Sequence, residues 1–98
     1  MTVLRIDRFT VDPTNTEEML TRRNALVTAI REAVPGLLEA RLARADDQTW
    51  IDIWRWDTLA NAQAAAQHAR SGGIPEAGAA FALAHILTTE FTELVDER

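Results

Sequence analysis

The stretch TWIDIWRWD, residues 49–57, decides the fold of this chain. Its concentration of β-branched and aromatic residues predicts a β-strand. Because successive side chains of a strand point to opposite faces, this strand divides into two sets. One set is Trp50, Asp52, Trp54 and Trp56, and the other is Ile51, Ile53 and Arg55. Neither set resembles a plain solvated surface, so both faces of the sheet are expected to be covered.

Further strands and helices are predicted on both sides of this stretch. Residues 2–11, 37–44 and 85–95 have the alternation of strands. A helix is predicted over residues 17–33, after a capping-box pattern at Thr14–Glu17 and before the stop signal Pro35-Gly36. Thr58 is expected to cap an alanine-rich helix over residues 59–70. Pro75 is expected to begin a short helix over residues 76–84.

The order of these elements, β-α-β-β-α-β, predicts a ferredoxin-like α+β fold with a four-stranded antiparallel sheet. The length of 98 residues predicts one domain, residues 1–98. A chain this short has a modest core of its own, and pairing with a second copy is a common remedy.

The composition argues against several classes of protein. A net charge of −5 disfavours nucleic acid as the main partner. The lack of cysteine excludes disulfides and thiolate metal sites. No apolar run approaches a membrane span and the N-terminus does not resemble a signal peptide, so the expected location is the cytoplasm. His68 and His85 have no spaced carboxylate motif beside them, so no metal or cofactor is expected.

The alternation extends to the neighbouring strands and gives two sets of residues. The aliphatic set is Leu4, Ile6, Arg8, Leu38, Ala40, Leu42, Ile51, Ile53 and Arg55. The tryptophan set is Val3, Arg5, Asp7, Phe9, Leu37, Glu39, Arg41, Trp50, Asp52, Trp54 and Trp56. Pattern alone favours the aliphatic set under the helices. The helices of one domain cover only one face, so we expect a homodimer built sheet to sheet.

The segments Pro35-Gly36-Leu37 and Glu39-Ala40-Arg41-Leu42, followed by TWIDIWRWD and an alanine-rich helix, resemble the antibiotic biosynthesis monooxygenase family. The similarity covers nearly the whole chain. It implies a dimeric α+β barrel with a pocket between the sheet and the helices of each subunit. Asp52 and Trp56 match an asparagine and a tryptophan that line this pocket in cofactor-free oxygenases of the family.

A second branch of the family, which degrades heme, has an asparagine in the first strand where Asp7 stands here. Both matched aspartates belong to the tryptophan set, so the resemblance implies that this set faces the helices, and we adopt that orientation. The heme branch also has a tryptophan on the second helix, where this chain has Ala64-Ala65-Ala66. The polyketide branch has a tyrosine there, and this chain contains none. The absence of the heme branch's tryptophan disfavours a heme-degrading role.

Arg23 lies at the centre of the apolar stripe of the first predicted helix, between Met19, Leu26 and Ile30. An unpaired arginine there is costly, so Arg23 is expected to contact Asp7 or Asp52. The alternatives are that Arg23 extends past the helix edge to water, or that it forms a purely structural pair. A structural network of the two aspartates with Arg5 and Arg41 is a further alternative to catalysis.

The resulting hypothesis is a small cofactor-independent monooxygenase that acts on an aromatic, polyketide-like phenolic molecule. The expected catalytic residues are Asp7, Asp52 and Arg23. The expected substrate-binding residues are Phe9, Arg41, Trp54, Trp56, Phe81 and His85. Two other classes remain open: a lyase, isomerase or cyclase on the same fold, and a ligand-binding dimer without catalysis.

Overall fold

The computed structural model describes residues 1–98, and its elements follow the predicted order. The strands are β1 (Val3–Val11), β2 (Leu37–Arg44), β3 (Thr49–Trp56) and β4 (Ala84–Glu93). They form one antiparallel sheet in the order β2-β3-β1-β4. The helices are α1 (Thr16–Ala33), α2 (Leu59–Arg70) and α3 (Pro75–Phe81), and the 3-10 turn η1 (Pro13–Asn15) precedes α1. This is the predicted ferredoxin-like α+β fold.

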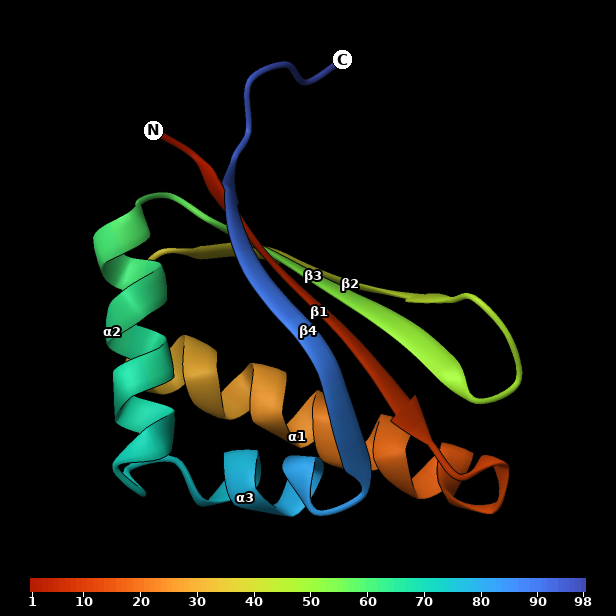
Figure 1. Cartoon of the computed structure of the whole chain (residues 1–98). Coiled ribbons are helices and arrows are strands. Elements are labelled where there is room, and N and C mark those ends of the chain that lie inside the picture. Colours follow the sequence, from red (N-terminus) through yellow and green to blue (C-terminus); the bar gives the residue numbers. More distant parts are fainter.

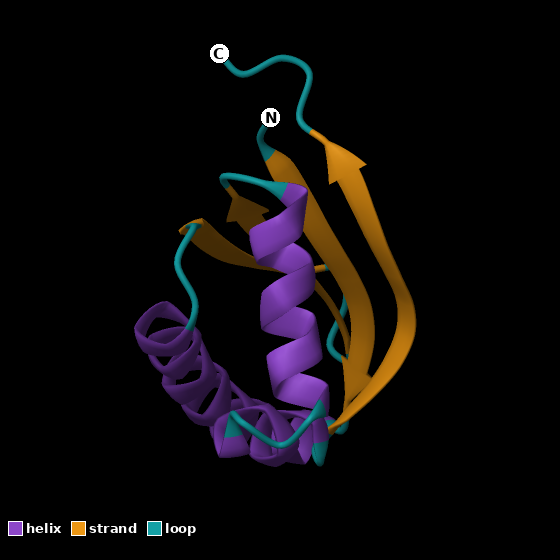
Figure 2. Ribbon diagram, turned by 90° about the vertical axis from the view of Figure 1, so that its left-hand side faces the viewer, coloured by secondary structure: helices purple, strands orange, loops and turns teal.

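The three helices lie together on one side of the sheet, and the other side is bare (Figure 2). Figure 1 shows α3 alongside α1, with α2 running across the direction of both. We call the two sides the covered face and the open face. No helix of the chain is both long and apolar enough to cross a membrane.

The turn between α1 and β2 requires glycine at position 36. Gly36 has a φ of 102°, in the left-handed region that side chains disfavour. A Cβ atom there would lie 2.3 Å from Asp57 Oδ1 and 2.6 Å from Asn61 Nδ2. The backbone of Asp57 donates to the Gly36 carbonyl over 2.9 Å. The turn is therefore fastened to the end of β3, and Pro35-Gly36 ends α1 as predicted.

The two predicted helix caps have different outcomes. Thr58 accepts a hydrogen bond from the backbone N–H of Asn61 over 3.1 Å, so the predicted cap of α2 is confirmed. The predicted capping box at Thr14–Glu17 is wrong. The carboxylate of Asp12 accepts from both the backbone and the hydroxyl of Thr14, which forms η1 and holds the pKa of Asp12 below its ordinary value. An aspartate readily closes such a local turn. Thr14 therefore lies inside η1, and α1 begins only at Thr16 with Asn15 as its N-cap, so Thr14 does not cap the helix.

The tryptophan set of β1 and β3 faces the helices, as the resemblance implies. Val3, Phe9, Trp50, Trp54 and Trp56 are all buried. The aliphatic set of these two strands therefore lies on the open face.

The prediction for β2 is wrong beyond Leu37. Leu37 lies opposite Trp56 and Glu39 lies opposite Arg55, so Leu38 is an extra residue that forms a β-bulge. One extra residue exchanges the two faces for the rest of the strand. Ala40 and Leu42 consequently pack on the core, whereas Glu39 and Arg41 project from the open face.

A second bulge occurs on β4, the other edge strand. Arg8 pairs with Thr88 and Phe9 pairs with Ile86, which leaves Leu87 as the extra residue. Ile86 is thereby directed to the covered face with Phe9. His85 pairs with Thr10 and lies on the open face. The expectation that His85 binds a substrate between the sheet and the helices is therefore wrong.

The core consists of two clusters with a polar region between them. The larger cluster joins α1, α2 and α3 to Trp54 and Trp56, and the smaller one surrounds Phe9 and Trp50. Asp52 lies between the two clusters on β3. Arg23 lies between them on α1, after Met19 of the smaller cluster and before Leu26 of the larger one.

Candidate functional site

Arg23 and Asp52 form a bidentate ion pair at the junction of the two clusters. Arg23 Nε donates to Asp52 Oδ2 over 3.1 Å, and Arg23 Nη2 donates to Asp52 Oδ1 over 2.9 Å. Trp54 Nε1 adds a third donor to Asp52 Oδ1 at 2.7 Å. Both side chains of the pair are largely buried, with 13% and 12% of their surface exposed. The predicted contact of Arg23 with an aspartate is present, and Asp52 is held by three hydrogen bonds.

Asp7 has fewer hydrogen-bond partners than Asp52. Its Oδ2 accepts from Arg5 Nε over 3.1 Å, and its Oδ1 accepts from the Thr89 hydroxyl over 2.5 Å. A hydroxyl can rotate its hydrogen toward another acceptor, unlike an indole N–H held in a packed core. Asp7 can therefore release one of its two partners at low cost.

The two aspartates are direct cross-strand neighbours on the covered face. Like charges opposite one another destabilise a sheet, so each carboxylate needs a cation of its own. Arg5 pairs with Asp7, and Arg23 pairs with Asp52. The result is a neutral cluster of two carboxylates and two guanidinium groups under the sheet. No group of three His, Cys, Asp or Glu side chains converges elsewhere to form a metal site.

Two cavities meet at this charged cluster. The first holds about 410 Å³ of empty space, part of it open to solvent, and lies between β1, β4, α1 and α3. Its walls are mainly apolar, and its charged groups are Asp7, Arg23 and Asp52. The second holds about 460 Å³, also partly open, and lies toward α2. Its lining residues are Arg5, Asp7, Leu26, Ile30, Asp52, Trp54, Trp56, Ala65, Ala69, Ala77 and Phe81.

Most of the predicted site residues line these cavities. Asp7, Asp52 and Phe81 line both, Phe9 and Arg23 line the first, and Trp54 and Trp56 line the second. Two predicted residues do not belong to the site. Arg41 is mostly exposed on the open face, where it pairs with Glu39, and His85 projects from the same face.

Three contributions to the site were not predicted. Arg5 was expected only as part of a structural network with the aspartates; it pairs with Asp7 as that alternative describes, and it also lines the second cavity. Thr89 could not be found, because the bulge at Leu87 decides its face. Ala65 and Ala69 of α2 form a wall of small side chains that leaves space for a ligand. Their spacing of four residues was visible in the sequence as one side of a helix.

Solved structures of other proteins have the same fold. SnoaB, a cofactor-independent oxygenase from Streptomyces nogalater, superposes with a TM-score of 0.72 at 24% identity, covering 98% of this chain and 95% of that one. An asparagine-to-alanine variant of SnoaB gives a TM-score of 0.64 at 27% identity, with 99% and 94% covered. A candidate antibiotic biosynthesis monooxygenase from Caulobacter crescentus gives 0.73 at 15% identity, with 97% and 91% covered.

No curated protein matches the chain. The family model of the antibiotic biosynthesis monooxygenases matches residues 2–82. This match spans most of the 98 residues, and it includes β1, β3 and the charged cluster between them. The chain therefore belongs to the antibiotic biosynthesis monooxygenase family.

Proposed function

We propose that this protein is a cofactor-independent monooxygenase that oxidises a phenolic or enolisable aromatic molecule in the first cavity. The observation that carries the proposal is the joint presence of Asp7 and Arg23 in one largely apolar cavity. A base and a cation beside an apolar surface suit a flat molecule that loses a proton and becomes an anion.

The two aspartates are suited to different roles. Asp52 is occupied by three hydrogen bonds, so its role is to orient Arg23. Arg23 Nη1 donates to no protein acceptor, which leaves it available to the oxygen of a bound anion. Asp7 lines the same cavity and has only Arg5 and the rotatable Thr89 hydroxyl as partners. Asp7 is therefore the proposed base.

The proposed reaction balances without a redox cofactor. Asp7 takes a proton from the substrate and leaves an electron-rich enolate or phenolate, whose negative oxygen pairs with Arg23. The anion passes one electron to O₂, and the resulting radical and superoxide combine as a peroxide anion. This anion takes the proton back from Asp7 and becomes a hydroperoxide. Loss of water from the hydroperoxide gives a carbonyl group. One oxygen atom enters the product and the other leaves as water.

Oxygen uptake tests this function directly. We expect the protein to accelerate O₂ consumption by 9-anthrone above the protein-free rate, with one O₂ used per carbonyl formed. Anthracene has the same three rings but no acidic proton, and it should consume none. Asp7→Asn should lower turnover by about 10²–10⁴-fold, the usual contribution of a general base.

The result also separates the two alternative classes. Conversion of a substrate under argon identifies a lyase, isomerase or cyclase that uses the same enolate. Tight binding of aromatic ligands with no conversion in air or argon identifies a ligand-binding protein. Either outcome contradicts the monooxygenase proposal.

We also propose that two copies pair through their open faces. The centre of this face carries half-buried aliphatic side chains on β1 and β3, among them Ile6 and Ile53, which are cross-strand partners. Charged residues surround them, including Arg8 and Arg41. An apolar centre with a polar rim is the usual anatomy of a protein interface.

A further inference from the structure

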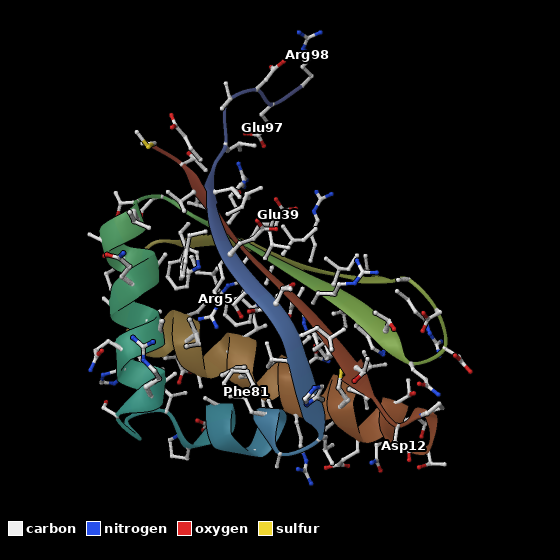
Figure 3. All side chains as sticks on the ribbon, viewed as in Figure 1. Arg5, Asp12, Glu39, Phe81, Glu97 and Arg98 are labelled. Atoms are coloured by element: carbon white, nitrogen blue, oxygen red, sulfur yellow. The ribbon has the colours of Figure 1, made fainter.

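Phe81 stands at the boundary between the two cavities. It is the last residue of α3, and it lines both cavities together with Asp7, Leu26 and Asp52. Leu26 and Asp52 are held in the core and in the ion pair, but Phe81 is 44% exposed. Figure 3 shows Phe81 on α3 and Arg5 in the region between the sheet and the helices. Of the two apolar residues that line both cavities, Phe81 is far less enclosed than Leu26.

Each cavity carries its own unpaired hydrogen-bond donors. In the first, Arg23 Nη1 has no protein acceptor. In the second, Arg5 uses only Nε, toward Asp7, and its two Nη groups donate to no protein atom. Trp56 lines the second cavity and its Nε1 is buried without a partner. The Nη groups of Arg5 are accessible and have no protein acceptor, so the second cavity is suited to an acceptor oxygen of a ligand.

We infer that Phe81 is a gate that sets how many rings the substrate of this site can have. With Phe81 between the cavities, a single-ring ligand occupies the first cavity alone. When Phe81 turns aside, the cavities join, and a three-ring ligand reaches from Arg23 to the donors of Arg5. This inference rests on the proposed function, since it assigns the substrate class of the same site.

The gate predicts a specific effect on affinity. Some ligands bind only a minor conformation of a protein. The apparent affinity of such a ligand is its intrinsic affinity multiplied by the fraction of molecules in that conformation. If Phe81 is aside in roughly one molecule in ten, a three-ring ligand loses about tenfold in affinity. A single-ring ligand loses nothing. Removal of the phenyl group should therefore tighten binding of the large ligand selectively.

Binding of 1-hydroxyanthraquinone and of phenol to the purified protein tests the gate. Neither ligand requires turnover, and titration calorimetry gives both dissociation constants. In Phe81→Ala we expect the dissociation constant of the three-ring ligand to fall about tenfold, with that of phenol within about twofold of the wild-type value. Phe81→Leu should lie between. Leu59→Ala removes a similarly exposed apolar side chain from α2, outside both cavities, and should change neither.

Tryptophan fluorescence locates the ligand. The chain has three tryptophans and no tyrosine, and Trp54 and Trp56 line only the second cavity. The three-ring ligand should quench the fluorescence of Trp54 and Trp56, and phenol should leave the tryptophan fluorescence nearly unchanged. 1-Hydroxyanthracene has three rings but no carbonyl oxygen for Arg5, so it should bind less tightly than 1-hydroxyanthraquinone.

The outcomes separate this inference from the proposed function. If Phe81→Ala weakens both ligands equally, or leaves the ratio of their affinities unchanged, Phe81 is an ordinary wall and the gate is overturned. Oxygen uptake by the wild-type protein with anthrone then remains a separate test of the monooxygenase proposal. If the size preference changes as expected but anthrone consumes no oxygen, the gate holds and the monooxygenase proposal is overturned. If no variant binds either ligand, both are overturned.

Discussion

The covered and open faces of the sheet carry similar charges in different surroundings. On the covered face, Arg23 and Asp52 are largely buried and meet in two parallel hydrogen bonds. On the open face, Arg55 bonds Glu97 of the C-terminal tail, and 61% of the Glu97 side chain is exposed. Arg55 Nε also lies 3.3 Å from Glu39 Oε2 but lacks hydrogen-bond geometry, so that contact is only electrostatic.

This difference shows that the contribution of an ion pair to stability depends on how far the pair is buried. A buried pair costs much free energy when one partner is removed, because the other charge stays out of water. An exposed pair is screened by solvent and contributes little. The charges of the covered face should therefore control both stability and chemistry, and those of the open face should affect the fold slightly.

Breaking the buried pair should have the largest effect. Arg23→Leu leaves Asp52 as an unpaired carboxylate in the core, and we expect a loss of about 3–5 kcal/mol of unfolding free energy. Urea unfolding followed by tryptophan fluorescence measures it.

The double variant Arg23→Leu with Asp52→Asn is the matched control. An asparagine at position 52 still offers an oxygen to Trp54 Nε1 but carries no charge, so most of the stability should return. Ligand binding and turnover should not return if Arg23 holds the substrate anion. Recovery of both stability and turnover would show that the pair is only structural. A loss below about 1 kcal/mol in Arg23→Leu would contradict its burial in solution.

A charge at the centre of the open face tests its proposed pairing with a second copy. Ile53→Asp places a carboxylate where two sheets would meet, and an unpaired charge in an interface costs about 2–5 kcal/mol. Sedimentation at micromolar concentration should give about twice 10.9 kDa for the wild type and 10.9 kDa for the variant. Ile53→Val should remain dimeric. A monomeric wild type contradicts the pairing outright.

The smallest effect is expected at Glu97. Glu97→Gln removes the charge that faces Arg55, and an exposed pair of this kind contributes about 0–1 kcal/mol. At low salt, the unfolding free energy of the variant should be slightly below that of the wild type. At high salt this difference should disappear. A loss comparable to that of Arg23→Leu would mean that the tail covers Arg55 far more closely in solution.

The sequence predicted the fold and the centre of the site well. The strand TWIDIWRWD, the stop at Pro35-Gly36 and the cap at Thr58 are local signals, and each is present in the structure. Arg23 was predicted to contact an aspartate because an arginine inside an apolar stripe must find a partner.

The errors arose where one residue changes the alternation of a strand. Arg41 was placed in the pocket by alternation along its strand, and His85 by its position at the start of the last strand; the structure puts both on the open face. The extra residues are Leu38 and Leu87, and nothing in these leucines themselves signals a bulge. Pattern alone favoured the aliphatic set under the helices, which is wrong for β1 and β3, and only the resemblance indicated the orientation that these strands have.

The two bulges have a consequence for how copies of this chain avoid uncontrolled association. They lie on β2 and β4, the two edges of the sheet, where free N–H and C=O groups offer a template to another strand. A bulge interrupts that template and increases the local twist, so a foreign strand cannot extend along the edge in register. Growth of the sheet into fibrils is therefore opposed at both of its edges.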